Sequence, residues 1–480
     1  MELFARLAHH AREHPKHAAA REVGPGRSAE VAYGALVGRV GGAARALKEA
    51  TPPGGVVVLV TGNRCEYFAA CLGVWAAGRV VLPVHPSAER EVPSAVARTG
   101  ASLVLVDARH TRLEQSELAG ARIEELSAFL ERAGEAELHK DAGVGAGLML
   151  QSSGTTGLPK IVRRSAEAVD AVARNVANAA GLLPEDRVLA AAPICHAYGI
   201  ENGFLGPLWA GATVHLTDGL DLPVALAELE HGCTVFPGVP FMFEVLARSG
   251  GRGGSLRLAY SAGGMLPPAV AQAFETSFGK RVGQLYGASE LGSVTFNHPD
   301  RPSPDPLSVG RPMEGVRVRI VDPGDQERDV DAGAEGLVLI HAPSMMSGYV
   351  DGEAPIVDGY FITGDLGRLD EAGNLTITGR LKQLIDVGGL KVNPAEVERV
   401  LMEHPGVAEC VVVAVPVTPT VSRLKAVVVG AGEAVDVEEL RRHARERLAG
   451  YKVPRLWEVR ESLPRTASGK VLRSALEGAV

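Results

Sequence analysis

The segment Gln151–Lys160, QSSGTTGLPK, places hydroxyl side chains, glycines and one lysine directly after an apolar run at Gly147–Leu150. Small residues after a strand can surround phosphate oxygens with backbone N–H groups and hydroxyls, and a lysine can neutralise their charge. The P-loop, GxxxxGK[ST], is a different pattern, because here Pro159 precedes the lysine. The segment predicts a phosphate-binding loop of another type. A surface turn rich in small residues is the alternative if the segment stands alone.

Four further segments with chemically useful residues follow in order: Gln284–Glu290 (QLYGASE), Tyr360–Leu366 (YFITGDL), Gly379–Lys382 (GRLK) with Gly388–Val392 (GGLKV), and Pro464–Lys470 (PRTASGK). Together with the loop they resemble the adenylate-forming superfamily, which includes acyl-CoA synthetases, firefly-luciferase-like enzymes and the adenylation domains of peptide synthetases. The resemblance covers essentially all 480 residues, and in texture it is closest to acyl- and aryl-CoA ligases. It implies that ATP activates a carboxylic acid to an acyl-adenylate, with release of pyrophosphate, before a thiol takes the acyl group.

By this resemblance the opening loop holds the β- and γ-phosphates of ATP while a carboxylate attacks the α-phosphorus. Its glycines let the backbone approach closely, its hydroxyls donate hydrogen bonds, and Lys160 adds positive charge. The sequence departs from the family directly after this lysine, where Ile161 stands in place of the usual Gly. The remaining loop residues are Ser152, Ser153, Gly154, Thr155, Thr156 and Gly157, of which Thr155 is also assigned to catalysis.

The next motifs imply contacts to the other parts of Mg²⁺–ATP. Glu290 matches the acid that holds Mg²⁺, a hard cation that prefers carboxylate oxygen. Asp365 matches the residue that accepts both ribose hydroxyls, with a structural turn as its alternative role. Arg380 matches a residue that reaches the ribose or a phosphate. The residues that would flank the adenine are Gly263, Tyr286 and Gly287.

Lys470 matches the lysine that bridges the substrate carboxylate and the α-phosphate during adenylation; a solvated surface charge is the alternative. Charge develops there in the transition state, so a fixed ammonium would lower its energy by about 2.7–4 kcal/mol, as other oxyanion stabilisers do. Lys382 matches the hinge about which a small domain turns between the two half-reactions. Gly388 and Gly389 would line the tunnel for a pantetheine thiol, which belongs either to coenzyme A or to the phosphopantetheine of a carrier protein.

The segment Pro193–Gly199, PICHAYG, resembles the P-x-x-H-x-Y-G stretch of acyl- and aryl-CoA ligases. His196 would sit where the substrate carboxylate enters, and structural packing is the alternative for this residue and for Tyr286. No Asp stands nearby to bind an amino group, and Glu201 is expected to serve local structure, so an α-amino acid substrate is disfavoured. An apolar pocket for an aryl or medium-length acyl group is expected from Tyr198, Gly199, Gly203, Val239, Phe241 and Ala262.

These residues must be positioned by two or three folding units, because 480 residues exceed one ordinary domain. Short β-branched runs alternate with Ala-rich segments of helical character, which predicts βα units and largely parallel sheets. We expect a large α/β domain at residues 1–379, with parallel sheets, flanking helices and a β-rich subdomain after about Leu307. A small, mobile α+β domain is expected at residues 380–480, with helices at Pro394–Glu403 and Val437–Leu448.

Composition and charge exclude several other classes. The formal net charge is -8, which argues against a general nucleic-acid binder. Five cysteines without a CxxC pair disfavour a disulfide framework or a zinc site and indicate the cytoplasm. The N-terminus is polar and charged, which is not the pattern of a secretory signal. Apolar runs such as Gly55–Val60 are far shorter than a membrane-spanning helix. The expected partners are therefore a small-molecule carboxylic acid and, as an alternative thiol donor, an acyl carrier protein.

Three rival readings of the same motifs remain. Gly287–Leu291 begins like the GxSxG elbow of serine hydrolases but ends in Leu. Ser152 and Ser153 with Lys160 also fit an amidase, and ATP-dependent release of pyrophosphate would separate both hydrolases from a ligase. A non-catalytic acyl sensor is disfavoured because the carboxylate and lysine positions are all present. His10 and His14 have the i, i+4 spacing of metal ligands, but a solvated helix explains them better.

Overall fold

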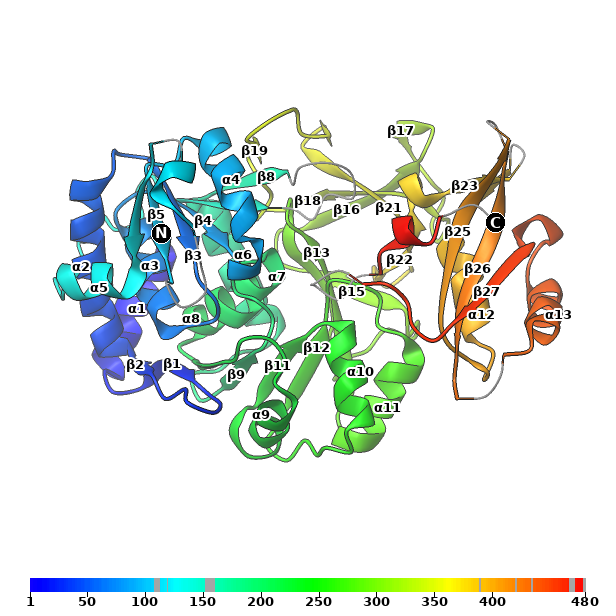
Figure 1. Cartoon of the computed structure of the whole chain (residues 1–480), viewed down its shortest axis with the longest axis horizontal. Coiled ribbons are helices and arrows are strands. Elements are labelled where there is room, and N and C mark those ends of the chain that lie inside the picture. Colours follow the sequence, from blue (N-terminus) through cyan, green and yellow to red (C-terminus); the bar gives the residue numbers. More distant parts are fainter. Residues whose placement is uncertain are drawn as a thin grey trace. The chain divides into compact units, whose positions relative to one another are not determined.

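The computed structural model describes residues 1–107, 113–118, 120–151, 160–387, 390–418, 421–432, 435–465 and 471–477. The chain forms two compact units (Figure 1). The first unit comprises Met1–Val318 and Ile340–Phe361, and the second comprises Arg319–Leu339 and Ile362–Val480. The chain therefore passes from one unit to the other three times, and three of its strands continue across these boundaries.

The first sheet of the first unit has the order β19-β8-β7-β4-β3-β5-β6. Its central strands pair in parallel, whereas β8 runs antiparallel to both β7 and β19. All five residues of β3 are buried, as expected where both faces of a parallel sheet are covered. The strands are β3 (Val56–Val60), β4 (Val80–Val84), β5 (Leu103–Val106), β6 (Arg122–Glu125), β7 (Gly147–Gln151), β8 (Ile161–Ser165) and β19 (Gly348–Tyr349).

A second sheet of the first unit has the order β15-β14-β13-β12-β11-β9-β10-β1-β2. The strands from β13 to β1 pair in parallel, and the pairs at both ends are antiparallel. The strands are β1 (Ala18–Glu22), β2 (Glu30–Ala32), β9 (Arg187–Ala190), β10 (Thr213–Leu216), β11 (Val235–Gly238), β12 (Leu258–Ser261), β13 (Val282–Ala288), β14 (Gly292–Asn297) and β15 (Ser308–Pro312).

Helices bury large side chains against these sheets. Trp75 and Phe68 are inaccessible to solvent and pack with Phe204, whose ring meets that of Phe68 edge to face at 4.6 Å between centroids. The helices are α1 (Glu2–Glu13), α2 (Tyr33–Ala50), α3 (Cys65–Ala76), α4 (Val92–Thr99), α5 (Leu126–Ala133), α6 (Ala166–Ala179), α7 (Ala197–Ile200), α8 (Gly206–Ala210), α9 (Leu222–Ala227), α10 (Pro240–Arg248) and α11 (Pro268–Phe278), with short turns η1 (Pro86–Glu91) and η2 (Gln115–Glu117) and π-helical turns η3 (Glu201–Leu205) and η4 (Glu228–Gly232).

The second unit begins with a run of strands in the order β17-β16-β18-β21-β22. The antiparallel pair β21–β22 places Asp365 opposite Arg380. The strands are β16 (Arg317–Asp322), β17 (Asp325–Asp329), β18 (Gly336–His341), β21 (Tyr360–Leu369) and β22 (Leu375–Arg380), and β20 (Ile356–Val357) pairs with the start of β21.

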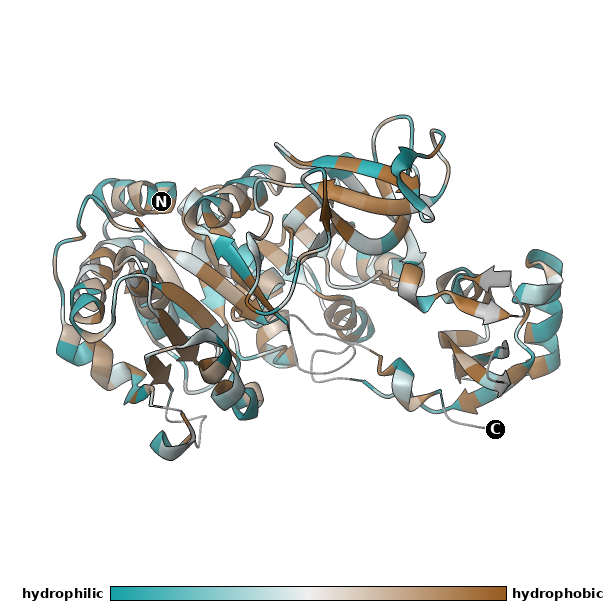
Figure 2. Cartoon of the chain, turned by 90° about the horizontal axis from the view of Figure 1, so that it is seen from above, coloured by the Kyte–Doolittle hydropathy of each residue, from teal (hydrophilic) through white to brown (hydrophobic). Residues whose placement is uncertain are grey.

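The C-terminal part of the second unit is an α+β arrangement. The three-stranded sheet β25-β26-β27 packs with α12 and α13 around Val397, Leu401, Val412, Ala426 and Leu440. In Figure 2 the charged helix α13 is mostly hydrophilic, and only Leu440 and Ala444 of it are buried. The elements are η5 (Leu381–Gln383), β23 (Ile385–Val387), β24 (Leu390–Val392), α12 (Pro394–Met402), β25 (Val407–Thr418), β26 (Val421–Gly430), α13 (Val437–Arg447), η6 (Gly450–Lys452), β27 (Leu456–Arg460) and η7 (Arg473–Ala475).

The predicted fold class is confirmed: a large α/β portion with helix-covered parallel sheets is followed by a smaller α+β portion. Among the described residues, no helix is both long and apolar enough to cross a membrane.

Candidate active site

Glu290 lies in the tight turn that joins β13 to β14. The hairpin closes at the pair Ala288 and Gly292, and Gly292 adopts the left-handed φ of +81° that glycine tolerates. A Cβ atom on Gly287 would lie 2.3 Å from the carbonyl oxygen of Gly292. Glycine at this position of the YGASE motif therefore permits the hairpin to close.

Donors outside the turn bind the carbonyl oxygens of residues 288–291. The Arg164 guanidinium donates to the first two, at 3.2 and 2.7 Å. The backbone N–H of Met346 donates to the third at 2.8 Å, and the Ser344 hydroxyl donates to the fourth at 2.6 Å. Four consecutive carbonyls with fixed partners hold the turn, and with it the backbone of Glu290, in one conformation.

Arg164 is held in turn by a buried ion pair. Its Nη1 lies 2.6 Å from Oε1 of Glu201, and the side chains are 0% and 2% exposed. The other oxygen of Glu201 accepts from the backbone N–H and the hydroxyl of Ser293, at 2.8 and 2.7 Å. The expectation that Glu201 serves local structure is confirmed. The sequence analysis did not predict a role for Arg164. The signal that could have indicated it is the alternation of faces along a strand, because adjacent arginines then point to opposite faces and Arg163 is the exposed one.

The Glu290 carboxylate accepts a hydrogen bond of 3.0 Å from the Tyr349 hydroxyl on Oε1. Burial of Tyr349, and next to it the charge of Glu290, raises the pKa of the phenol. The ammonium of Lys160 lies 4.4 Å from the centre of the Tyr349 ring. This half-buried carboxylate, anchored through one oxygen, suits Mg²⁺, which proteins bind through one or two carboxylates together with substrate phosphates.

The residues expected around adenine lie at the carboxyl ends of neighbouring parallel strands. β12 ends at Ser261, which pairs with Gln284 of β13. Gly263 follows β12 with a left-handed φ of +83°, while Tyr286 is half-buried on β13 and Gly287 is exposed. Ligands of open α/β sheets bind at this edge.

His196 precedes α7, and its side chain is exposed. Its backbone N–H donates to the carbonyl of Pro193 at 3.1 Å. A Cβ atom on Gly199 would approach the same carbonyl oxygen to 2.0 Å, so this motif needs glycine for close packing. The structure places His196 at the N-terminal cap position of α7, on the surface of the protein.

Two residues of this segment, Tyr198 and Gly199, line a narrow cavity. Gly203 also lines it, together with Asn202, which was not predicted. The cavity is too narrow for a water molecule. The other predicted acyl-pocket residues do not line it: Phe241 is 45% exposed at the start of α10, and Val239 and Ala262 follow β11 and β12. The full lining is Ala190, Ala192, Tyr198, Gly199, Asn202, Gly203 and Pro237.

In the second unit the structure brings together Asp365 and Arg380. Arg380 Nε lies 2.8 Å from Oδ1 of Asp365, whose side chain is 6% exposed against 60% for the arginine. The two were predicted as separate ligands for ATP, and their cross-strand pairing was not. The arginine holds one oxygen of this buried carboxylate in a fixed position across the strand pair.

Several predicted residues lie outside the described part of the chain, and their roles stay predictions. The backbone of Lys382 belongs to η5, but its side chain lies outside the described part of the structure. The others are Ser152, Ser153, Gly154, Thr155, Thr156, Gly157, Gly388, Gly389 and Lys470.

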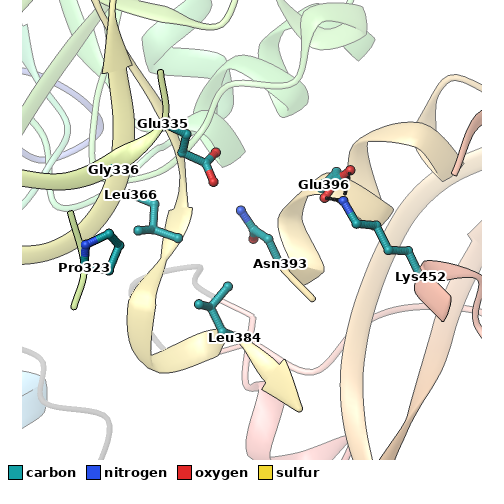
Figure 3. Close-up of a pocket in the computed structure, with 8 residues that line it drawn as sticks. All are labelled: Pro323, Glu335, Gly336, Leu366, Leu384, Asn393, Glu396 and Lys452. Carbon is teal, nitrogen blue, oxygen red and sulfur yellow. Dashed lines mark hydrogen bonds and ion pairs between the residues drawn. The ribbon is translucent and has the colours of Figure 1, made fainter. Parts of the chain in front are cut away.

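A larger cavity of about 240 Å³ lies within the second unit (Figure 3). The Lys452 ammonium there contacts both carboxylate oxygens of Glu396 at 2.7 Å, and Asn393 donates to the carbonyl of Thr378. The cavity lining contains none of the predicted site residues that the structure describes. The lining residues are Pro323, Glu335, Gly336, Leu366, Leu384, Asn393, Glu396 and Lys452.

His215, Glu228 and Cys233 in the first unit have the donor atoms of a metal site within 4.8 Å of one another. They also bond to each other: Nδ1 of His215 lies 2.7 Å from Oε2 of Glu228, and the Cys233 thiol donates to the same oxygen at 3.4 Å. Burial raises the pKa of the Cys233 thiol, which disfavours the thiolate that a metal needs. Hydrogen bonds among the three side chains account for the cluster.

Comparison with known proteins gives consistent matches along the chain. Residues 7–350 match the family described as AMP-binding enzyme, and residues 396–470 match the AMP-binding enzyme C-terminal domain. Feruloyl-CoA synthase of Amycolatopsis sp is 31% identical over 456 residues, 92% of each chain. Malonate–CoA ligase of Arabidopsis thaliana is 29% identical over 478 residues, 88% of this chain and 78% of that protein. ATP-bound MatB from Rhodopseudomonas palustris has a TM-score of 0.89 at 26% identity, covering 99% of this chain and 98% of the other.

Proposed function

The chain belongs to the AMP-binding enzyme family, and we propose that it is an acid–thiol ligase that joins a carboxylic acid to coenzyme A at the expense of ATP. The observation that carries the proposal is the clamped turn of residues 288–291, which fixes Glu290 at the carboxyl end of β13. A fixed carboxylate there is suited to a metal–nucleotide complex. Two relatives that match over most of their length are named as a malonate–CoA ligase and a feruloyl-CoA synthase.

In the first half-reaction an oxygen of the substrate carboxylate bonds to the α-phosphorus of ATP. The bond from that phosphorus to the pyrophosphate oxygen breaks, so the products are acyl-adenylate and pyrophosphate. Lys470 would hold the attacking carboxylate and the α-phosphate together, and Asp365 would accept the ribose hydroxyls. Mg²⁺ held by Glu290 would neutralise charge on the phosphate oxygens. The loop of Ser152–Gly157, with Lys160, would bind the departing phosphates.

In the second half-reaction the sulfur of the pantetheine thiol bonds to the acyl carbonyl carbon. The bond from that carbon to the AMP oxygen breaks, and the thioester and AMP are released. We assign Lys382 to the hinge between the two half-reactions and Gly388 and Gly389 to the thiol tunnel. Coenzyme A is favoured over a carrier protein as the thiol because the names of both relatives specify a CoA thioester.

The acyl site is assigned to His196 and to the cavity lined by Tyr198 and Gly199, which closely follow it in the chain. The cavity does not hold a water molecule, so side chains such as Tyr198 must move when an acyl group enters. His196 is exposed and would meet the entering carboxylate.

The five cysteines are free and buried, which supports a reducing compartment such as the cytoplasm.

The proposal is tested by a panel of aryl, medium-chain acyl and dicarboxylic acids in a pyrophosphate-release assay. Each acid is assayed with and without coenzyme A, and with a phosphopantetheinylated carrier protein as the other thiol. We expect acid-dependent pyrophosphate release, and a thioester detected by mass spectrometry with coenzyme A. Cleavage of an ester or amide without ATP would instead favour the hydrolase alternatives.

A further inference from the structure

We propose that Tyr349 is a positioning residue for the metal-binding carboxylate: its hydroxyl holds Oε1 of Glu290 and so directs the carboxylate toward the divalent cation of the nucleotide complex. The inference rests on the proposed function, and it adds a residue that none of the sequence motifs contains. Tyr349 lies on β19, some sixty residues after Glu290 in the chain.

The hydrogen bond from Tyr349 has the geometry to restrict Glu290. The hydroxyl lies 3.0 Å from Oε1, and the tyrosine side chain is only 8% exposed, so its ring has little freedom to move. A glutamate side chain has three rotatable bonds, and the clamped turn fixes only the backbone from which they start. The Tyr349 hydroxyl is therefore the described contact that fixes the far end of this side chain.

The backbone on both sides of Tyr349 is also fixed. β19 pairs with β8, placing Tyr349 opposite Val162. The N–H of Val350 donates to the carbonyl of Ile161 at 2.8 Å, and the N–H of Ser347 donates to the carbonyl of Arg163 at 2.9 Å. Strand β8 begins directly after Lys160, so Tyr349 is anchored opposite a residue that lies two positions after that lysine.

Tyr349 contacts both charged groups that the proposed function assigns to the nucleotide. The Lys160 ammonium lies over its ring at 4.4 Å, while its hydroxyl binds Glu290. A cation over an aromatic face is attracted by the ring quadrupole. A single side chain thus sets the relative positions of a lysine for phosphate and a carboxylate for the metal.

The chemistry of the bond suits this role. A neutral phenol donates a hydrogen bond to Oε1 without cancelling the carboxylate charge, which leaves Oε2 to face a cation.

The test is Tyr349→Phe, which removes the hydroxyl but keeps the ring under Lys160. Tyr33→Phe is the matched control, because Tyr33 is also buried and its hydroxyl donates one hydrogen bond, to the carbonyl of Ala212 at 2.8 Å. Binding of Mn²⁺ to the complex with a non-hydrolysable ATP analogue is followed by electron paramagnetic resonance. We expect the Mn²⁺ dissociation constant to rise about tenfold in Tyr349→Phe and to stay unchanged in Tyr33→Phe, with both melting temperatures similar.

A second comparison shows whether Tyr349 acts through Glu290. In a Glu290→Gln background the carboxylate charge is gone, so Tyr349→Phe should have no further effect on Mn²⁺ binding. If Glu290→Gln weakens Mn²⁺ binding but Tyr349→Phe does not, the positioning role is wrong and the proposed function stands. If the wild-type protein does not bind the Mn²⁺–nucleotide complex, the proposed function fails and the positioning role fails with it.

Discussion

Arg164 and Glu201 form a buried ion pair, with 2.6 Å between Nη1 and Oε1, and the remaining donors and acceptors of both side chains are bound to the hairpin that carries Glu290. The pair joins β8 to the turn between β13 and β14. Two charges removed from water this completely persist only where further hydrogen bonds satisfy them, and here the backbone of the candidate active site provides those bonds.

Arg164→Met is expected to destabilise the protein by about 3–5 kcal/mol, because it leaves Glu201 as an unpaired buried charge and two carbonyls without their donor. Urea denaturation measures the loss. Arg163→Met is the control, since this neighbour on the same strand is exposed. An equal loss of stability in the two variants would show that the buried pair has no special role.

Asp365→Ala is expected to weaken ATP binding at least tenfold, since a carboxylate that accepts ribose hydroxyls contributes about 1.5–3 kcal/mol per bond. Calorimetry with a non-hydrolysable ATP analogue measures the affinity. The control is Asp329→Ala, which breaks an exposed Arg–Asp pair in the same unit, with Arg319 Nε at 2.9 Å from Oδ1 of Asp329. Unchanged nucleotide affinity in Asp365→Ala would remove this residue from the ribose site.

Lys470→Ala is expected to abolish acyl-adenylate formation and to spare transfer of a supplied synthetic acyl-adenylate to the thiol. The lysine is assigned to the charge that develops at the α-phosphate, and the second half-reaction does not involve that charge. Single-turnover kinetics of each half-reaction check the assignment. Equal loss of both half-reactions in a folded variant would contradict it.

Asp186 gives a prediction for acid stability. Burial raises the pKa of this carboxyl, but hydrogen bonds from Arg257, Thr234 and the N–H of Leu183 outweigh burial and hold the pKa below its ordinary value. A group with a lowered folded-state pKa stabilises the protein above its unfolded pKa, about 3.9, and this contribution is lost as the pH falls through the folded value.

The melting temperature of Asp186→Asn should therefore lie below that of the wild-type protein at neutral pH, and the gap should close below about pH 4. Thermal denaturation at a series of pH values measures the gap. Asp325→Asn, at an exposed aspartate, is the control. A gap that is constant down to pH 3 would mean that the asparagine disturbs packing rather than removing a charge.

Local pattern was enough to predict much of the fold. The helix expected at Pro394–Glu403 is observed at Pro394–Met402, and the one expected at Val437–Leu448 is observed at Val437–Arg447. Each has one apolar face, and Asn393 or Asp436 caps its N-terminus through the side chain. Such signals lie within a few residues of the element they define, so a single sequence reveals them.

The candidate site was predictable only in part. Glu290 and Asp365 stand in short motifs, but the residues that hold them come from distant positions. In the sequence Arg164 cannot be distinguished from its neighbour Arg163 on the same strand. Its burial depends on Glu201, which lies 37 residues away in the chain. Tyr349 reads as an ordinary strand residue until the fold brings it to Glu290. Partners that meet only through tertiary pairing leave no local periodicity in the sequence.

The three passages of the chain between its two compact units constrain how such a protein can recombine with a relative. A single crossover at Gly379–Lys382 would transfer only residues after that point and would leave Arg319–Leu339, all of β21 and most of β22 with the recipient. The donor Arg380 would then face a recipient Asp365 across the β21–β22 pair. Exchange of the whole second unit needs three crossovers, near residues 318, 339 and 361. With a single crossover near residue 318, the second unit is inherited whole only if the first-unit segment Ile340–Phe361 is inherited with it.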